Sequence, residues 1–114
     1  MKLGSAISFF SLLVLVAGTS ASAEDVQGRA VYTKWCVPCH GRGPGHPGTT
    51  ALAAVYQNTK PPALEDRMDL TVTAIKQSVR KGVLVMPYFR KTEISDTELD
   101  ALAAYLAGGK AARK

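Results

Sequence analysis

The chain has few of the residues that define several large protein classes. Only two cysteines and two histidines occur in 114 residues, and the net charge is a modest +5. No basic stripe interleaved with aromatic residues is present, which argues against nucleic acid as a partner. No apolar run reaches the ~20 residues that a membrane-spanning helix requires, so we expect no stable membrane insertion. No internal repeat or second domain is visible either.

The N-terminal segment predicts export. Lys2 is its only charge, an apolar run extends from Ile7 to Ala17, and small residues end at Ala21-Ser22-Ala23. This order is typical of a cleaved signal peptide, so residues 1–23 are expected to be removed before Glu24 and the protein to be periplasmic. A membrane anchor is the alternative, and the run is short for one.

The remaining residues, 24–114, are expected to form one domain. With 13 basic and 9 acidic residues its net charge is 13 − 9 = +4. A chain of 114 − 23 = 91 residues buries a modest core, and proteins of this size often depend on a metal or cofactor.

Four helices are predicted along this domain. Their expected limits are residues 24–36, 50–57, 71–82 and 95–108, with loops at 41–48 and 83–89. In the first helix we expect Val26, Ala30, Val31 and Trp35 to share one apolar face. The fold class is therefore all-α, with long loops that contribute to the core.

Helix limits are clearest where capping residues occur. Thr71 is suited to cap the third helix, and Gly82 is suited to end it in a left-handed conformation. The segment Ser95-Asp96-Thr97-Glu98 is a capping box, followed by an apolar stripe at Leu99, Leu102, Ala103 and Leu106. The segment Val83 to Phe89 is interrupted by Pro87 and is predicted to be a loop that lies on the core.

The segment Cys36-Val37-Pro38-Cys39-His40 contains the most specific chemistry. On a helical turn, Cys36, Cys39 and His40 face one side. Two thioether bonds to one haem, with the His40 imidazole as an axial ligand of the iron, would use all three side chains. The alternatives are a redox-active dithiol, a zinc site that includes His46, and a structural disulfide, each of which fits the spacing or the context less well.

The second axial ligand is predicted to be Met86. It lies in an apolar segment, Val83 to Phe89, whereas Met68 lies among charged residues that are costly to bring to an apolar cofactor. A core methionine and His46 as the ligand are the alternatives. A thioether ligand favours ferrous iron, and iron with both axial positions filled favours electron transfer over catalysis. We expect the His40 tautomer to be fixed by a backbone carbonyl of the 44–48 loop, with Pro47 as first choice.

These residues resemble the class I c-type cytochromes over the whole of 24–114. The resemblance rests on the haem motif preceded by Gly28 to Tyr32, on Met86-Pro87, and on Leu102 to Leu106. It implies a fold of about four helices wrapped around one covalently bound haem c. It also implies that the first and last helices cross closely, with Gly28, Tyr32, Leu102 and Tyr105 at the crossing.

A closer resemblance is to the cytochrome subunit of bacterial flavocytochromes that oxidise 4-alkylphenols, the 4-cresol dehydrogenase and eugenol hydroxylase type. It rests on Pro47 to Thr49, Lys60 to Leu64 and Met86 to Ser95. It implies an electron-transfer subunit with no catalytic site of its own, which accepts electrons from the flavin of a flavoprotein dehydrogenase and passes them to a soluble redox carrier. The implied docking residues are Val37, Pro38, Tyr88 and Phe89, with Arg42, Arg90 and Lys91 at the rim, although Tyr88 and Phe89 also suit simple packing on the haem.

Three further functions remain as alternatives at this point. The first is a free-standing periplasmic carrier that delivers electrons to a terminal oxidase. The second is a haem enzyme or gas sensor with an open iron site, and the third is a haem-free structural module.

Overall fold

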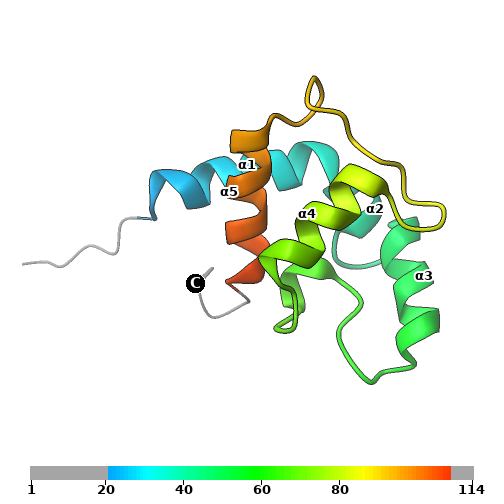
Figure 1. Ribbon diagram of the computed structural model, residues 1–114. Helices are drawn as coiled ribbons and strands as arrows, with labels where there is room; N and C mark the ends of the chain where they lie inside the picture. Colours follow the sequence, from blue (N-terminus) through cyan, green and yellow to red (C-terminus); the bar gives the residue numbers. More distant parts are fainter. Residues whose placement is uncertain (1–20, 109–114) are drawn as a thin grey trace, which may run out of the picture.

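The computed structural model describes residues 21–108, and this part of the chain is helical (Figure 1). Its elements are α1 (Ala23–Trp35), α2 (Val37–His40), α3 (Pro47–Tyr56), the 3₁₀ helix η1 (Leu64–Asp66), α4 (Val72–Lys81) and α5 (Asp96–Ala107). The all-α prediction is confirmed. The four expected helices are present, and the short α2 and η1 were not predicted as separate elements.

The close crossing of α1 and α5 organises the core (Figure 1). Gly28 of α1 is buried against α5, and a Cβ atom there would lie 2.6 Å from Tyr105 Cβ and would collide with the Ala101 carbonyl. Tyr32 and Tyr105 pack beside this point with their ring centroids 5.9 Å apart. The crossing expected at Gly28, Tyr32, Leu102 and Tyr105 is confirmed, and all four residues are buried.

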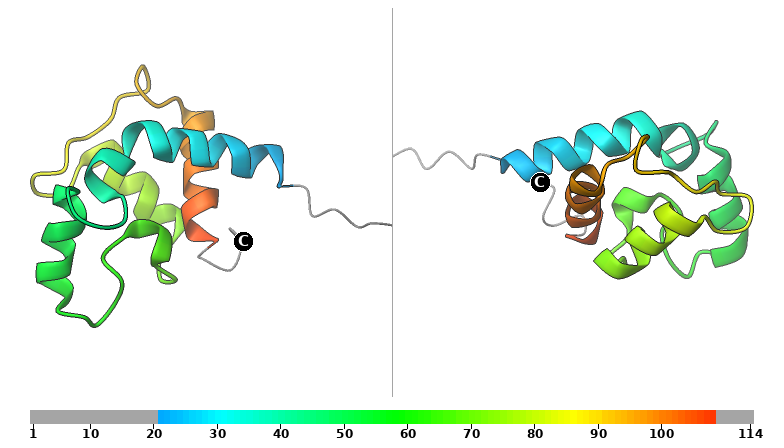
Figure 2. Two further views of the ribbon diagram at one scale, coloured as in Figure 1. Left: turned by 180° about the vertical axis from the view of Figure 1, so that it is seen from behind. Right: turned by 45° about the horizontal axis from the view of Figure 1, so that its top comes forward.

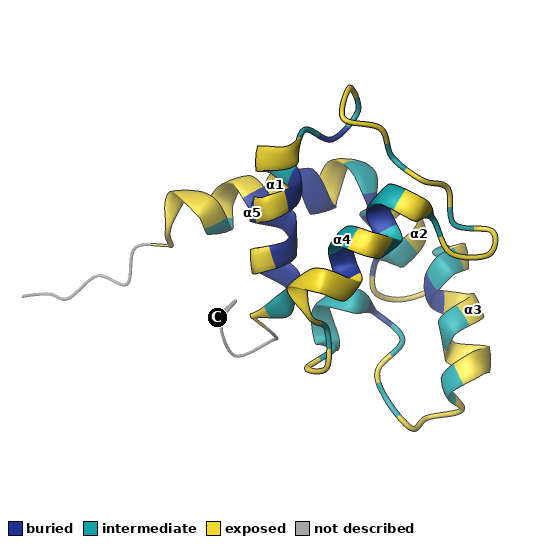
Figure 3. Ribbon diagram, in the orientation of Figure 1, coloured by how far each residue is buried: buried dark blue, intermediate teal, exposed yellow. Residues whose placement is uncertain are grey.

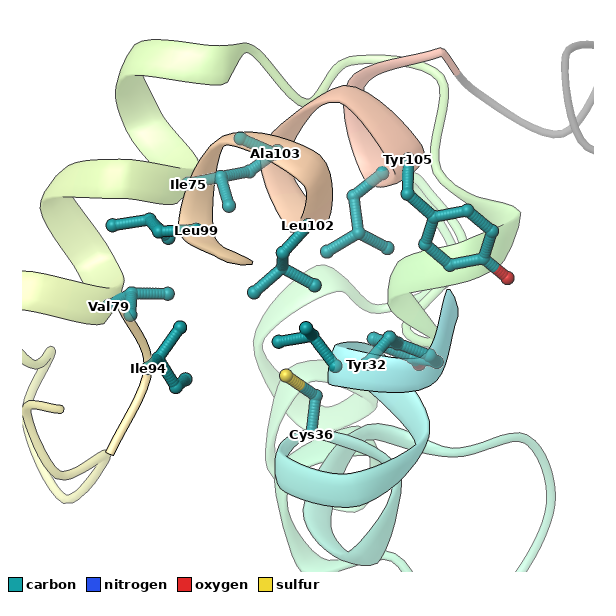
Figure 4. Close-up of a cluster of buried hydrophobic side chains, with 11 residues drawn as sticks. Tyr32, Cys36, Ile75, Val79, Ile94, Leu99, Leu102, Ala103 and Tyr105 are labelled. Atoms are coloured by element: carbon teal, nitrogen blue, oxygen red, sulfur yellow. The ribbon is translucent and has the colours of Figure 1, made fainter. Parts of the chain in front are cut away.

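The core lies between α1, α4 and α5, with Ile94 beside it (Figure 4). The predicted stripe of α5 is confirmed, because Leu99, Leu102, Ala103 and Leu106 are all buried. Ala101 and Tyr105 are buried as well, since α5 is covered by α4 on one side and by α1 on another.

The predicted face of α1 was partly wrong. Val26 is 60 % exposed and Ala30 is exposed, whereas Val31 is buried and Trp35 is half-buried. The buried positions are instead Gly28, Val31, Tyr32 and Cys36, which follow the same helical spacing with a different phase. Gly28, the small residue at the crossing, decides which face of α1 is buried. A search for large apolar residues does not detect this position.

The second predicted helix begins earlier than expected. It was placed at 50–57, but α3 starts at Pro47, so the 41–48 loop is shorter than predicted. Proline is well tolerated in the first turn of a helix because it lacks only an N–H that has no intrahelical partner there. The helix ends at Gln57, whose φ of 45° is left-handed.

Local capping signals were reliable for α4 and α5. The Thr71 side chain accepts a hydrogen bond from the Ala74 N–H, and Gly82 ends α4 with a φ of 72°. Ser95 and Glu98 form the predicted reciprocal capping box at the start of α5. These ends fix where the loop between α4 and α5 begins and finishes.

Most of the Val83 to Phe89 loop does not lie on the core, contrary to the prediction, although Phe89 at its end packs against the core (Figures 2 and 3). It runs from the end of α4 back across the molecule to α5, and Val83, Leu84 and Val85 are 51 %, 101 % and 97 % exposed. Val83 and Met86 pair with each other in an isolated bridge, so the apolar residues between them form the tip of a tight turn. Only Met86 and Phe89 are half-buried.

The proposed boundary between signal peptide and domain, at Ala23 and Glu24, lies at the edge of the described chain. Residues 1–20, which contain the apolar run, and residues 109–114 are outside it. Ser22, which precedes the expected cleavage point, caps α1 by accepting a hydrogen bond from the Asp25 N–H at 3.2 Å. Within residues 21–108, no helix has the length and apolar character to span a bilayer.

We predict that Gly28→Ala destabilises the protein although alanine is the better helix former. The new methyl group would meet the backbone of α5, which cannot rotate away, and overpacking of this kind costs about 1–3 kcal/mol. Thermal unfolding should show a melting temperature several degrees lower. Gln27→Ala, at the neighbouring exposed position, is the matched control, and a Gly28→Ala protein as stable as this control would show that the crossing tolerates a side chain.

Candidate haem-binding site

One helical turn carries the three residues predicted to bind the cofactor. Cys36 ends α1 and begins α2, and its carbonyl accepts hydrogen bonds from the N–H groups of Cys39 at 3.1 Å and His40 at 2.8 Å. The Gly41 N–H closes the turn on the Val37 carbonyl at 2.9 Å. Cys36 thus precedes α2, and Cys39 and His40 lie on it, so the three residues share one turn.

The two cysteines are free thiols in different environments. Cys36 is buried, and Figure 4 shows its sulfur directed toward the apolar cluster, whereas Cys39 is exposed. Burial, with a smaller contribution from the nearby Cys39, raises the pKa of the Cys36 thiol to about 12. Redox-active dithiols depend on the opposite shift, a thiol pKa lowered below its ordinary value. The raised pKa gives the dithiol alternative no support, and the two cysteines are not joined in a disulfide.

His40 is half-buried, and burial lowers the pKa of its imidazole. The neutral imidazole favoured by this shift is the form that binds a metal. Its Nδ1 atom is buried and has no hydrogen-bond partner among residues 21–108. The expected bond to the Pro47 carbonyl is thus not formed, because Pro47 already belongs to α3.

Gly48 is a site residue that the sequence interpretation missed. A Cβ atom at this position would lie 2.8 Å from Cε1 and 2.9 Å from Nδ1 of the His40 ring, and 2.7 Å from the Cys39 carbonyl. Only glycine lets the first turn of α3 approach the imidazole so closely. Its place in a glycine-rich segment directly after the haem motif was the available signal.

His46 packs against the same turn. A Cβ atom on Gly41 would lie 2.6 to 3.0 Å from three atoms of the His46 ring, and His46 Nδ1 lies 3.3 Å from the Pro38 carbonyl oxygen. In residues 21–108 no three His, Cys, Asp or Glu side chains are grouped to hold a metal ion. The position of His46 on the backbone of α2 supports neither the zinc alternative nor its use as the second axial ligand.

Met86 is held in a loop that is anchored at both ends. The Met86 N–H and carbonyl both bond to Val83, at 2.9 and 3.2 Å, and the Phe89 N–H bonds to the Val79 carbonyl at 2.7 Å. Gly82 lies so close to the Met86 carbonyl oxygen that a Cβ atom there would be 2.6 Å from it. Met86 is half-buried, whereas Met68, the other methionine considered, is 66 % exposed.

Arg80 strengthens the second anchor of this loop. Its guanidinium donates to the Phe89 carbonyl at 3.1 Å and to Asp96 at 2.9 Å, which joins α4, the loop and the start of α5. Hydrogen bonds from Lys91 and Arg80 lower the pKa of Asp96, so its carboxylate stays charged at neutral pH. Edge-on packing of Phe89 on Trp35, with ring centroids 5.7 Å apart, connects the loop to α1.

The residues present fit a covalently bound haem. Two free thiols and a neutral imidazole with a buried, unbonded ring nitrogen lie on one turn, and a thioether lies in a separate anchored loop. Several partly buried apolar side chains pack against the core next to these residues. A haem would provide apolar surface that such side chains can cover. These are Trp35, Val37, Leu64, Leu70 and Phe89. The donor set of thiol, imidazole and thioether is the one that c-type haem uses.

The helical fold and this motif define a c-type cytochrome domain with the class I cytochrome c fold. The chain belongs to the family described as cytochrome c oxidase, cbb3-type, subunit III, whose family model matches residues 23–106 and so extends from α1 to α5. Comparison with curated proteins and with solved structures gives no significant match. The protein is therefore a haem-binding electron carrier.

Proposed function

We propose that this protein is an exported cytochrome with one covalently attached haem, and that it accepts single electrons from the flavin of a 4-alkylphenol-oxidising flavoprotein dehydrogenase. The observation that carries electron transfer is the pairing of a haem-attachment turn with a methionine loop anchored at both ends. The flavoprotein partner is supported by the resemblance of residues 47–49, 60–64 and 86–95 to the cytochrome subunit of such flavocytochromes.

The proposed roles follow the chemistry of each side chain. Cys36 and Cys39 attach the haem through thioether bonds, and His40 and Met86 are the axial ligands. Haem held in this way supplies one-electron oxidation and reduction. Gly48 keeps the imidazole of His40 in place, and Gly82 and Arg80 keep the Met86 loop in place. With both axial positions filled, the protein has no catalytic site of its own.

The exposed turn before Met86 is the proposed docking surface. Leu84 is fully exposed, has a left-handed φ of 51°, and lies beside exposed Val83 and Val85. Tyr88 is 62 % exposed and remains a candidate docking residue, whereas Phe89 packs on Trp35 and is less accessible to a partner. We expect a partner with an apolar patch that receives this turn.

The charged residues expected at the rim all have partners within the chain. Arg42 pairs with Glu65 and Asp66, Arg90 with Glu93, and Lys91 with Asp96. Their charge toward a partner is therefore partly neutralised. Apolar contact at the turn is expected to contribute more to docking than charge does.

A second candidate is a free-standing periplasmic carrier that delivers electrons to a terminal oxidase. It is favoured by the family to which the chain belongs, since the family description names a subunit of a cytochrome c oxidase. In either case the proposed site residues are the same, and residues 1–23 have the same proposed role as a signal peptide. The two candidates differ only in the protein that delivers the electrons and the protein that receives them.

Covalent attachment and export are tested together by intact mass. We predict that the protein purified from periplasm has the mass of residues 24–114 plus one haem, and that denaturation does not release the haem. Cys36→Ser and Cys39→Ser should each lose one thioether bond, and the double variant should carry no covalent haem. An exported wild-type chain without added mass, made where cytochrome maturation is active, would contradict the proposal.

The ligand role of Met86 is tested by Met86→Ala with Met68→Ala as the matched control. Loss of the thioether ligand should make the ferric spectrum high-spin and lower the midpoint potential, within the roughly 0.8 V range over which axial ligands tune haem. Met68 is exposed and away from the proposed ligands in sequence, so its variant should keep the wild-type spectrum and potential. A low-spin Met86→Ala protein with unchanged potential would exclude this role.

The docking proposal is tested with Leu84→Asp and, as the matched control, Val55→Asp on α3, where Val55 is 73 % exposed. Aspartate tolerates a left-handed backbone, so Leu84→Asp should leave the fold intact. Loss of a contact at the interface centre should slow reduction by the reduced flavoprotein about tenfold or more, equivalent to ~1.4 kcal/mol. Equal reduction rates for the two variants would show that this turn is not part of the interface. If no flavoprotein co-purifies with the wild-type protein, the free carrier is favoured.

A further inference from the structure

Three consecutive residues at the end of the haem-attachment turn, His40, Gly41 and Arg42, are each bound by a different element. The Tyr32 hydroxyl of α1 donates to the His40 carbonyl at 2.9 Å, and the buried Thr49 hydroxyl of α3 donates to the Gly41 carbonyl at 2.8 Å. The third residue, Arg42, is bound by η1. Carbonyl groups at the end of a helix have no intrahelical donor, so these bonds both satisfy and locate the backbone of His40.

Arg42 is bound to η1 by two carboxylates. Its Nη1 atom lies 2.6 Å from Glu65, and its Nε and Nη2 atoms donate to Asp66 at 3.0 to 3.1 Å. The hydrogen bond to Asp66 raises the pKa of the guanidinium further, and nearby Glu65 and Asp66 add to this shift. A two-carboxylate clamp of this geometry fixes direction as well as distance.

Glu65 connects this clamp to the helix crossing. Its other carboxylate oxygen accepts a hydrogen bond from the Tyr105 hydroxyl of α5, which Figure 4 shows pointing out of the apolar cluster. The Glu65 side chain is only 18 % exposed, so its bonds are made in a poorly hydrated environment where charge-assisted contacts are strong.

We infer that Glu65 is a positioning residue for the axial ligand His40. Its carboxylate joins Tyr105 at the crossing of α1 and α5 to Arg42 at the exit of the haem-attachment turn, and Tyr32 from the same crossing holds the His40 carbonyl. The position of the imidazole is thus set by the crossing of α1 and α5 through two routes. This inference rests on the proposed haem-binding role of Cys36, Cys39 and His40.

The charge of Glu65 has a second consequence. A negative group near the haem favours the more positive, oxidised state of the iron and so lowers the midpoint potential. Replacing the Glu65 carboxylate by an amide removes one of the two carboxylates that bind Arg42 and makes the surroundings more positive. The amide variant should therefore have a higher potential than the wild type.

The experiment compares the holoprotein with the Glu65→Gln, Tyr105→Phe and Asp100→Asn variants. Asp100 is an exposed acid on α5 paired with Lys76, so Asp100→Asn removes the same charge away from the Arg42 clamp. Two properties are measured in each: the midpoint potential, and the iron–imidazole stretching band in the resonance Raman spectrum of the ferrous protein. For the second property the distal ligand is removed by the additional change Met86→Ala in every protein, because this band requires five-coordinate iron.

We expect Glu65→Gln to raise the potential and to shift or broaden the iron–imidazole band. Tyr105→Phe keeps the ring in the core and removes only the hydroxyl, so it should shift the band in the same direction by a smaller amount. Asp100→Asn should change neither. If Glu65→Gln and Asp100→Asn shift the potential equally, or if Glu65→Gln lowers only the melting temperature, Glu65 is structural and the inference is wrong.

Failure to obtain holoprotein has a different meaning for the Glu65→Gln variant and for the wild type. If Glu65→Gln yields no holoprotein, Tyr105→Phe decides, because an unchanged band in that variant overturns the inference. If the wild-type protein itself carries no covalent haem, the proposed function has failed before any variant is compared. The two failures are therefore distinguishable.

Discussion

The close contact of α1 and α5 is the constraint on which the rest of the structure depends. It exists because residue 28 has no side chain, so the backbones approach until Gly28 touches Ala101 and Tyr105. Cys36 is the residue at which α1 ends, and α2, the proposed haem-attachment turn, follows without an intervening loop. The direction of α1 at the crossing therefore determines where His40 lies relative to the core.

What the sequence predicted well was local in origin. The caps at Thr71 and Ser95, the stop at Gly82 and the grouping of Cys36, Cys39 and His40 all depend on residues within four positions of each other. Hydrogen bonds from capping side chains reach only two or three residues along the chain, so the required partner is visible in the sequence. The α5 stripe was predicted for the same reason, because its period is a property of one helix.

What the sequence did not predict depends on partners far along the chain. Helical periodicity assigned Val26 and Ala30 to the buried face of α1, but both are exposed and Gly28 is buried against α5. The family resemblance placed Gly28 at the crossing, whereas periodicity alone did not. The loop at 83–89 was expected on the core, yet its turn is closed by the pairing of Val83 with Met86, which leaves Leu84 and Val85 exposed. The contact of Glu65 with Arg42 and Tyr105 spans 23 and 40 residues, beyond any local pattern.

The two sides of the proposed haem site are stabilised in different ways, and the difference suits electron transfer. The His40 side is fixed residue by residue: Tyr32 holds its carbonyl, Thr49 holds the next, and Gly48 contacts its ring. The Met86 side is fixed within its own loop and at the ends of that loop: Met86 pairs with Val83, Gly82 ends α4, and Arg80 holds the Phe89 carbonyl. The exposed turn at Leu84, which is the proposed docking surface, lies between these anchors. Because Met86 follows Leu84 by two residues, a partner that bound at the proposed docking surface would lie beside the proposed methionine ligand.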